Sequence, residues 1–170
     1  RVLLIDAIER VEVALRTQFA YRLAHACGPH ALLDSGRFHA KAPGWSYKGY
    51  RQSLEEEFQG SKEIFVQHLR SKYEEPLPPI WAAVEIMTLG QLSKWYANLG
   101  HRRDRNLVAH VFDFDESNLV TFLHHLVVVR NLCAHHSRVW NRRFAFPLKV
   151  PRDRPVAVLS SLNRGAPRNL

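Results

Sequence analysis

The sequence predicts an all-α bundle of five or six helices, and three observations support this fold class. Apolar residues recur at three- and four-residue spacing in several long stretches. Glycine and proline separate these stretches from one another. No stretch alternates apolar and polar residues for long enough to indicate a β-strand. We therefore expect the helices to pack around one shared apolar core.

The composition is that of one compact domain. Of the 170 residues, 46% are hydrophobic and 24% are charged. A chain of this length buries roughly 70% of the surface that its unfolded form exposes, so its core needs no disulfide or structural metal. It has two cysteines and no apolar run long enough to cross a membrane. We expect a cytoplasmic protein without a cofactor or a membrane partner.

The first stretch predicts one long amphipathic helix over residues 2–27, which Gly28 and Pro29 end. Because this helical pattern starts directly after Arg1, we expect the chain to be a fragment. Glu12 and Arg16 lie on or beside the apolar stripe, four residues apart, and can form an ion pair within the helix. The apolar positions are Ile5, Ile8, Leu15, Phe19 and Leu23.

Residues 30–47 predict an irregular segment with a short turn near residues 31–34. A second helical stretch covers residues 47–73 and is interrupted at Gly60 and Ser61. Its interruption divides the stretch into two helices.

Residues 74–79 form a proline-rich linker before the next helix. Pro79 suits the first turn of that helix, because the N–H that proline lacks would be unpaired there. Residues 80–98 predict a single helix, which Gly100 closes.

A short helix over residues 102–112 and a turn at 113–115 precede the last long helix, residues 118 to about 136. Asp115 or Ser117 can cap that helix. We expect residues 146–170 to be extended or loosely packed, because prolines interrupt them and no helical period is clear. The resulting division is a helical domain, residues 1–146, and a basic C-terminal extension, residues 147–170.

The formal charge of +8 comes almost entirely from the C-terminal part of the chain. Basic and acidic residues nearly balance up to Ser137, whereas eight basic residues oppose a single aspartate after it. Arginines with interleaved aromatic residues suit RNA, because guanidinium groups pair with phosphates and aromatic rings stack on bases. On charge alone, a solvated tail is an equal alternative. We expect Trp140, within this segment, to pack in the core.

The last long helix combines an apolar body with a polar end. Residues 119–129 are apolar almost all the way round, which indicates burial against neighbouring helices or a second subunit. Arg130, Asn131 and His135 follow at once, and such groups are costly there unless they are paired or lie in a wet cleft. Helical geometry places Arg130 about 140° from His135. Either the helix ends near Ala134, or a second copy completes the site in a symmetric dimer.

The block R-N-x-x-A-H-H-x-R-x-W-N-R, residues 130–142, resembles the Abi-like abortive-infection proteins of bacteria. Within the block, R-x-x-x-x-H is similar to the signature of the HEPN ribonuclease superfamily. Two further stretches share the resemblance, one in the first helix from Ile5 to Arg16 and one reading W-x-x-x-E-x-x-x-x-G-x-L-S from Trp81 to Ser93.

This resemblance implies an all-α HEPN fold, a homodimer and cleavage of RNA without a metal ion. His135 would act as general acid or base. Arg130 would hold the phosphoryl oxygens as their charge grows, and Asn131 would orient the histidine or bind a phosphate oxygen. The residues expected to contact RNA or to support the catalytic groups are His136, Arg138, Asn141, Arg142 and Arg143.

Alternative interpretations remain open at this point. Arg130 and His135 can also be a polar cluster that caps the helix. The same basic surface can serve a non-catalytic module that binds RNA or a neutralising protein partner, and a purely structural helical subunit is a third alternative. The spacing of the histidines does not favour zinc.

A second copy of the motif, R-N-L-V-A-H, begins at Arg105 and ends at His110. It could be a second catalytic half-site within the chain. The copy lies in a short charged helix and lacks the H-x-R-x-W-N-R continuation. We therefore interpret it as coincidence.

Overall fold

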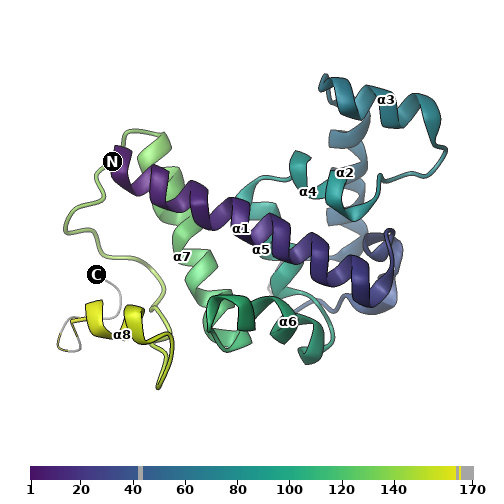
Figure 1. Cartoon of the computed structure of the whole chain (residues 1–170). Coiled ribbons are helices and arrows are strands. Elements are labelled where there is room, and N and C mark those ends of the chain that lie inside the picture. The colour runs from purple at the N-terminus through teal and green to yellow at the C-terminus, as the bar shows by residue number, and fades with distance from the viewer. Residues whose placement is uncertain (42–43, 164, 166–170) are drawn as a thin grey trace.

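The computed structural model describes residues 1–41, 44–163 and 165, and its architecture is all-α (Figure 1). Eight α-helices and three short 3-10 turns make up the regular structure of these residues, with one isolated β-bridge between Phe38 and Leu99. The predicted fold class is confirmed. The α-helices are α1 (Val2–Cys27), α2 (Tyr47–Gly60), α3 (Ile64–Lys72), α4 (Ile80–Ile86), α5 (Leu89–Ala97), α6 (Arg102–Ala109), α7 (Glu116–Ala134) and α8 (Val156–Ser161).

Helix α1 is the spine of the bundle and has the predicted bounds. It packs against α4, α6 and α7, and it buries Leu15, Phe19 and Leu23 almost completely. Gly28 ends the helix with φ 86°, a backbone conformation that glycine adopts without the steric cost of a Cβ. Burial of this stripe of large apolar side chains stabilises the packing of α1 against these three helices.

Helices α2 and α3 form an arm at the end of the molecule away from α7 (Figure 1). The Ser46 hydroxyl begins α2 by accepting a hydrogen bond from the Gly49 N–H. The chain breaks its helical course after Gly60, as predicted, and resumes it at Ile64.

The predicted single helix over residues 80–98 is wrong, because the chain forms α4 and α5 there. Thr88 and Gln91 build a capping box: the threonine hydroxyl accepts from the Gln91 N–H, and the glutamine side chain accepts from the Thr88 N–H. Such a box starts a new helix by satisfying backbone donors that would otherwise be unpaired. Apolar spacing alone continues through this break, so it hid the boundary.

Helix α7 lies against α1, α5 and α6. Asp115 caps its first turn by accepting from the Ser117 N–H, as the sequence indicated. Only four of its residues are buried within the chain, and most of the apolar residues on its remaining faces are half-buried. The helix therefore keeps apolar surface that this chain does not fully cover.

The C-terminal segment is more ordered than predicted. It turns back along α7 from the carboxyl end of that helix towards its start and then forms α8, a helix that the sequence does not predict (Figure 1). Phe146 contacts the ring of His124, Lys149 donates to the Ser117 hydroxyl, and Arg154 pairs with Asp113 at 3.7 Å. These contacts with α7 and the turn before it hold the segment in place. Helical periodicity within the segment does not predict them. Residues 164 and 166–170 of the predicted extension lie outside the described residues.

Candidate active site

The end of α7 is built by two backbone hydrogen bonds that close the helix. The Ser137 N–H donates to the Leu132 carbonyl at 2.8 Å, and the His136 N–H donates to the Cys133 carbonyl at 3.2 Å. This pair is the Schellman arrangement, which requires a left-handed residue just after the helix. His136 takes that place with φ 52°. The block of residues 130–142 therefore begins inside α7 and leaves the helix at His136.

His136 occupies a backbone position that glycine prefers, so we expect His136→Gly to stabilise the fold by about 0.5–1 kcal/mol. A left-handed conformation costs a residue with a Cβ about 1–2 kcal/mol, and the added chain entropy of glycine offsets part of that gain. Urea unfolding of the variant measures the difference. His136→Ala is the control: it keeps a Cβ and should bring no such gain. A lower midpoint for the glycine variant would contradict the assignment of the strain.

His135 is the cap residue of α7, and its backbone still follows the helical course. Its φ and ψ are −89° and 18°, and its N–H donates to the Asn131 carbonyl at 2.9 Å. Side chains along such a course keep helical directions, so His135 projects about 140° away from Arg130. The sequence left two alternatives, a helix that ends near Ala134 or a site completed by a second copy. The helix does end at Ala134, but this ending does not turn the His135 side chain towards Arg130.

The predicted catalytic side chains lie at the surface. Arg130, Asn131 and His135 are exposed, and none of them makes a side-chain hydrogen bond or ion pair with another described residue. Unpaired polar groups at a surface are available to a ligand. The supporting residues predicted from the sequence are exposed as well, namely His136, Arg138, Asn141, Arg142 and Arg143.

A pocket of about 480 Å³ opens between α1 and the end of α7, and Arg130 lines it. We call it the α1–α7 pocket. Its volume lies within the usual range for small-ligand sites, about 300–1,000 Å³. His135 and Asn131 are not among its lining residues, so the structure places only one predicted catalytic residue in it. The lining consists of Ile5, Glu9, Glu12, Val13, Arg16, Arg130 and Ala134.

The floor of the pocket is fixed by a buried ion pair. Glu12 and Arg16 form the predicted contact within α1, with 2.6 Å between Oε1 and the guanidinium nitrogen. Arg16 also donates to the carbonyls of Val84 and Met87, at 3.0 and 2.7 Å. These carbonyls lie at the end of α4, where a cation is favourable and backbone acceptors lack helical partners. The sequence indicated the pair but not its role in joining α1 to α4.

A comparison with known protein families gives a match that covers most of the chain. A family model described as Abi-like protein matches residues 1–141. The chain belongs to the Abi-like protein family. No curated protein and no solved structure matches the chain.

The match to the Abi-like model ends at residue 141, one residue before the end of the block that covers residues 130–142. The segment that returns along α7 therefore lies beyond the matched region. Phe146 anchors it between two histidines of α7, with ring centroids 4.1 Å from His124 and 4.6 Å from His125. Burial lowers the pKa of His124, and the charge of Lys94 lowers it further. Loss of hydration against the Phe146 ring costs the charged imidazolium more than the neutral imidazole, which is the physical cause of this direction.

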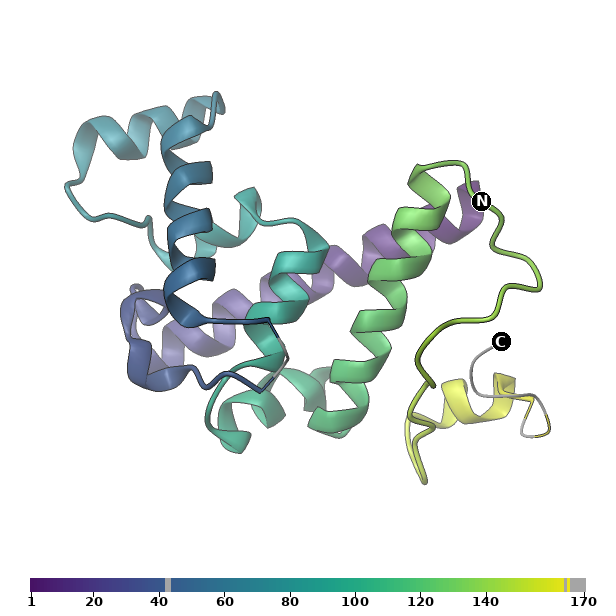
Figure 2. The same cartoon turned by 180° about the vertical axis from the view of Figure 1, so that it is seen from behind.

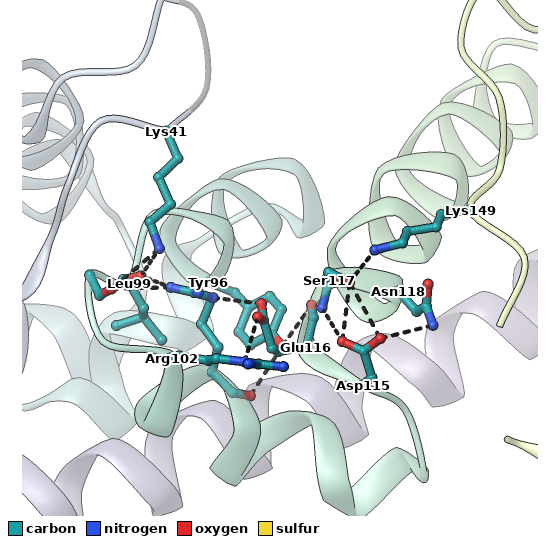
Figure 3. A network of polar contacts seen from close by, with 11 residues as sticks. Lys41, Tyr96, Leu99, Arg102, Asp115, Glu116, Ser117, Asn118 and Lys149 are labelled. Atoms are coloured by element: carbon teal, nitrogen blue, oxygen red, sulfur yellow. Dashed lines mark hydrogen bonds and ion pairs between the residues drawn. The ribbon is translucent and has the colours of Figure 1, made fainter. Parts of the chain in front are cut away.

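In the second copy of the motif, internal contacts of this Abi-like protein hold the arginine in place. Arg105 is buried, and its Nε pairs at 2.9 Å with Oε2 of Glu116, which Figure 3 labels. Its guanidinium also donates to the carbonyls of Leu99 and Gly100. The Tyr96 hydroxyl donates to the Arg105 carbonyl at 3.1 Å. These contacts leave the Arg105 side chain engaged with the fold.

The prediction that Trp140 packs in the core is wrong, since its exposed fraction is 87%. The left-handed turn at His136 directs the chain away from the helices before Trp140, so the core cannot cover the indole. Within the described part of the chain, no three histidine, cysteine or acidic side chains lie close enough to hold a metal ion. Among the described helices, none combines the length and the apolar character that a bilayer crossing requires.

Proposed function

We propose that this Abi-like protein is a metal-independent endoribonuclease of the HEPN type that acts in abortive infection, the bacterial defence against phage. Arg130, Asn131 and His135 would form its catalytic site. The observation that carries the proposal is the contrast between two identical motif beginnings. The Arg105 side chain is buried and makes an ion pair and hydrogen bonds within the fold. The Arg130 side chain is exposed, pairs with no described residue and lines a pocket.

The chemistry follows from the side chains available. Cleavage starts when the ribose 2′-OH loses a proton and its oxygen attacks the adjacent phosphorus. The bond from phosphorus to the 5′-oxygen then breaks, and that oxygen takes up a proton. The products are a 2′,3′-cyclic phosphate and a 5′-hydroxyl. Histidine is a common general acid or base in enzymes, which is the role we assign to His135, and Arg130 can stabilise the growing phosphoryl charge.

A homodimer would assemble the site from both subunits. Arg130 and His135 of one chain project in directions that differ by about 140°, so one copy does not point both at the same phosphate. The start of α1 lies beside the end of α7 (Figure 2). Its Val2 and Leu3 are 81% and 84% exposed. An exposed apolar patch next to the polar block suits the contact with a second copy.

The basic C-terminal segment would extend the RNA contact beyond the cleaved phosphate. Arg138, Arg142 and Arg143 follow the catalytic residues directly and are exposed. Guanidinium groups bind phosphates in a forked geometry, and this binding is independent of base sequence. We expect RNA affinity to fall steeply with salt for the same reason.

Incubation of the purified protein with total RNA in the presence of EDTA tests the proposal. We expect cleavage that resists the chelator and falls by at least about 100-fold in each of Arg130→Ala and His135→Ala. General acid–base catalysis by a histidine contributes about 10²–10⁴-fold, and one donor that stabilises transition-state charge contributes about 10²–10³-fold. His110→Ala is the matched control and should cut RNA at the wild-type rate. Tight binding of RNA that stays intact would instead favour the non-catalytic module, and loss of cleavage in His110→Ala but not in His135→Ala would overturn our choice of motif.

A further inference from the structure

The α1–α7 pocket has a lining that a phosphate alone does not explain. Arg130 and Arg16 would attract a phosphate, but Glu9 and Glu12 also face the pocket. A carboxylate accepts hydrogen bonds and donates none, and its negative charge repels a phosphate bound in the same pocket. The part of the ligand that meets the carboxylates must therefore carry hydrogen-bond donors.

The two carboxylates differ in their availability. Glu12 is buried, and its Oε1 is committed to Arg16 at 2.6 Å. Glu9 is exposed and forms no ion pair or hydrogen bond with another described residue. Glu9 therefore offers both of its oxygens to a ligand.

The walls beside Glu9 are apolar. Ile5 and Val13 stand four residues before and after Glu9, which puts the three side chains on one face of α1. A carboxylate flanked by apolar groups suits a flat ring that donates at one edge and packs through its faces. The nucleobases of single-stranded RNA are bound in this way by proteins, through their Watson–Crick edges and their faces.

Among the four RNA bases, only guanine presents two adjacent donors on its Watson–Crick edge, N1–H and the N2 amino group. Cytosine and adenine offer one amino donor beside a ring acceptor, and uracil offers one N–H between two carbonyls. A carboxylate would meet an acceptor in each of those three bases. Guanine is thus the base that one glutamate can bind through both oxygens.

We propose that the α1–α7 pocket binds a guanine base next to the cleaved phosphate, with Glu9 accepting from N1–H and from the N2 amino group. Glu9 is then the residue that determines base specificity, while Arg130 holds the adjoining phosphate. This inference rests on the proposed ribonuclease function, because it assigns the substrate of the same site. Glu12 and Arg16 act as positioning residues that keep the floor of the pocket in place.

The test compares guanosine with inosine, which lacks only the N2 amino group. An oligoribonucleotide of uridines with a single guanosine should be cut beside that guanosine, and inosine at the same place should slow cleavage by about tenfold, the worth of one hydrogen bond to a charged group. Glu9→Gln should cut the two oligonucleotides at equal rates. Glu56→Gln, which changes an exposed glutamate of α2, should keep the wild-type preference.

Binding of GMP and IMP, measured by calorimetry, separates failure of this inference from failure of the proposed function. Cleavage without preference between guanosine and inosine would overturn the guanine pocket and leave the ribonuclease standing. GMP binding that exceeds IMP binding and is lost in Glu9→Gln, together with intact RNA, would support the pocket and overturn the ribonuclease. The absence of both cleavage and GMP binding would overturn both proposals.

Discussion

Arg105→Ala is expected to destabilise the fold by about 3–5 kcal/mol, the usual cost of removing one partner from a buried ion pair. The side chains of Arg105 and Glu116 keep only 10% and 12% of their exposure, so Glu116 would be left as a largely buried carboxylate. The carbonyls of Leu99 and Gly100 would lose the same donor. Together these groups hold the loop between α5 and α6 to the first turn of α7 (Figure 3).

Denaturant unfolding measures this effect, with Arg102→Ala as the matched control. Arg102 also pairs with Glu116, at 3.2 Å, but its side chain is 74% exposed. Exposed pairs contribute about 0–1 kcal/mol, so the control should unfold close to the wild-type midpoint. Equal, small losses in the two variants would contradict a structural role for Arg105 and would reopen the second motif as a functional site.

The different surroundings of Arg105 and Arg130 could not be predicted from the sequence. Both begin the pattern R-N-L-x-A-H, yet one is buried in a network and the other is exposed. The partners of Arg105 are the loop after α5 and the start of α7, and only the tertiary fold brings them together. The residues that follow each copy were the signal available in the sequence, and they led us to choose the copy that begins at Arg130.

The helices themselves could be predicted wherever an apolar stripe ended at a strong breaker. Gly28 ends α1 at the expected residue, and Gly60 divides α2 from α3. The division of α4 from α5 depends instead on the capping box at Thr88, a local polar signal within an uninterrupted apolar pattern. It could have been found from the T-x-x-Q spacing.

The pocket could not be predicted, because it joins residues that are far apart in the sequence. Glu9 comes from α1 and Arg130 from α7, and no spacing within either segment reveals that the two helices lie side by side. The return of the C-terminal segment along α7 was hidden for the same reason: its order comes from contacts such as Phe146 with His124. Periodicity reports the faces of a helix and not the element that covers each face.

Mixing the two inactive variants Arg130→Ala and His135→Ala is expected to restore about a quarter of wild-type RNA cleavage. In the proposed dimer each site uses Arg130 of one subunit and His135 of the other. Random exchange of subunits gives about half heterodimers, and each heterodimer has one complete site of two. This recovered rate is large, because the cleavage rate of either variant alone should be at least about 100-fold below that of the wild type.

Differently tagged copies of the two variants verify the exchange, since one tag should then capture the other. Each variant exchanged with itself is the control and should stay inactive. Recovery of cleavage would establish that the arginine and the histidine act from different chains, in keeping with their divergent directions at the end of α7. Verified heterodimers that remain inactive would show that both residues must come from the same chain. The turn at His136 would then have to rearrange when RNA binds, because His135 follows the helical course in this structure.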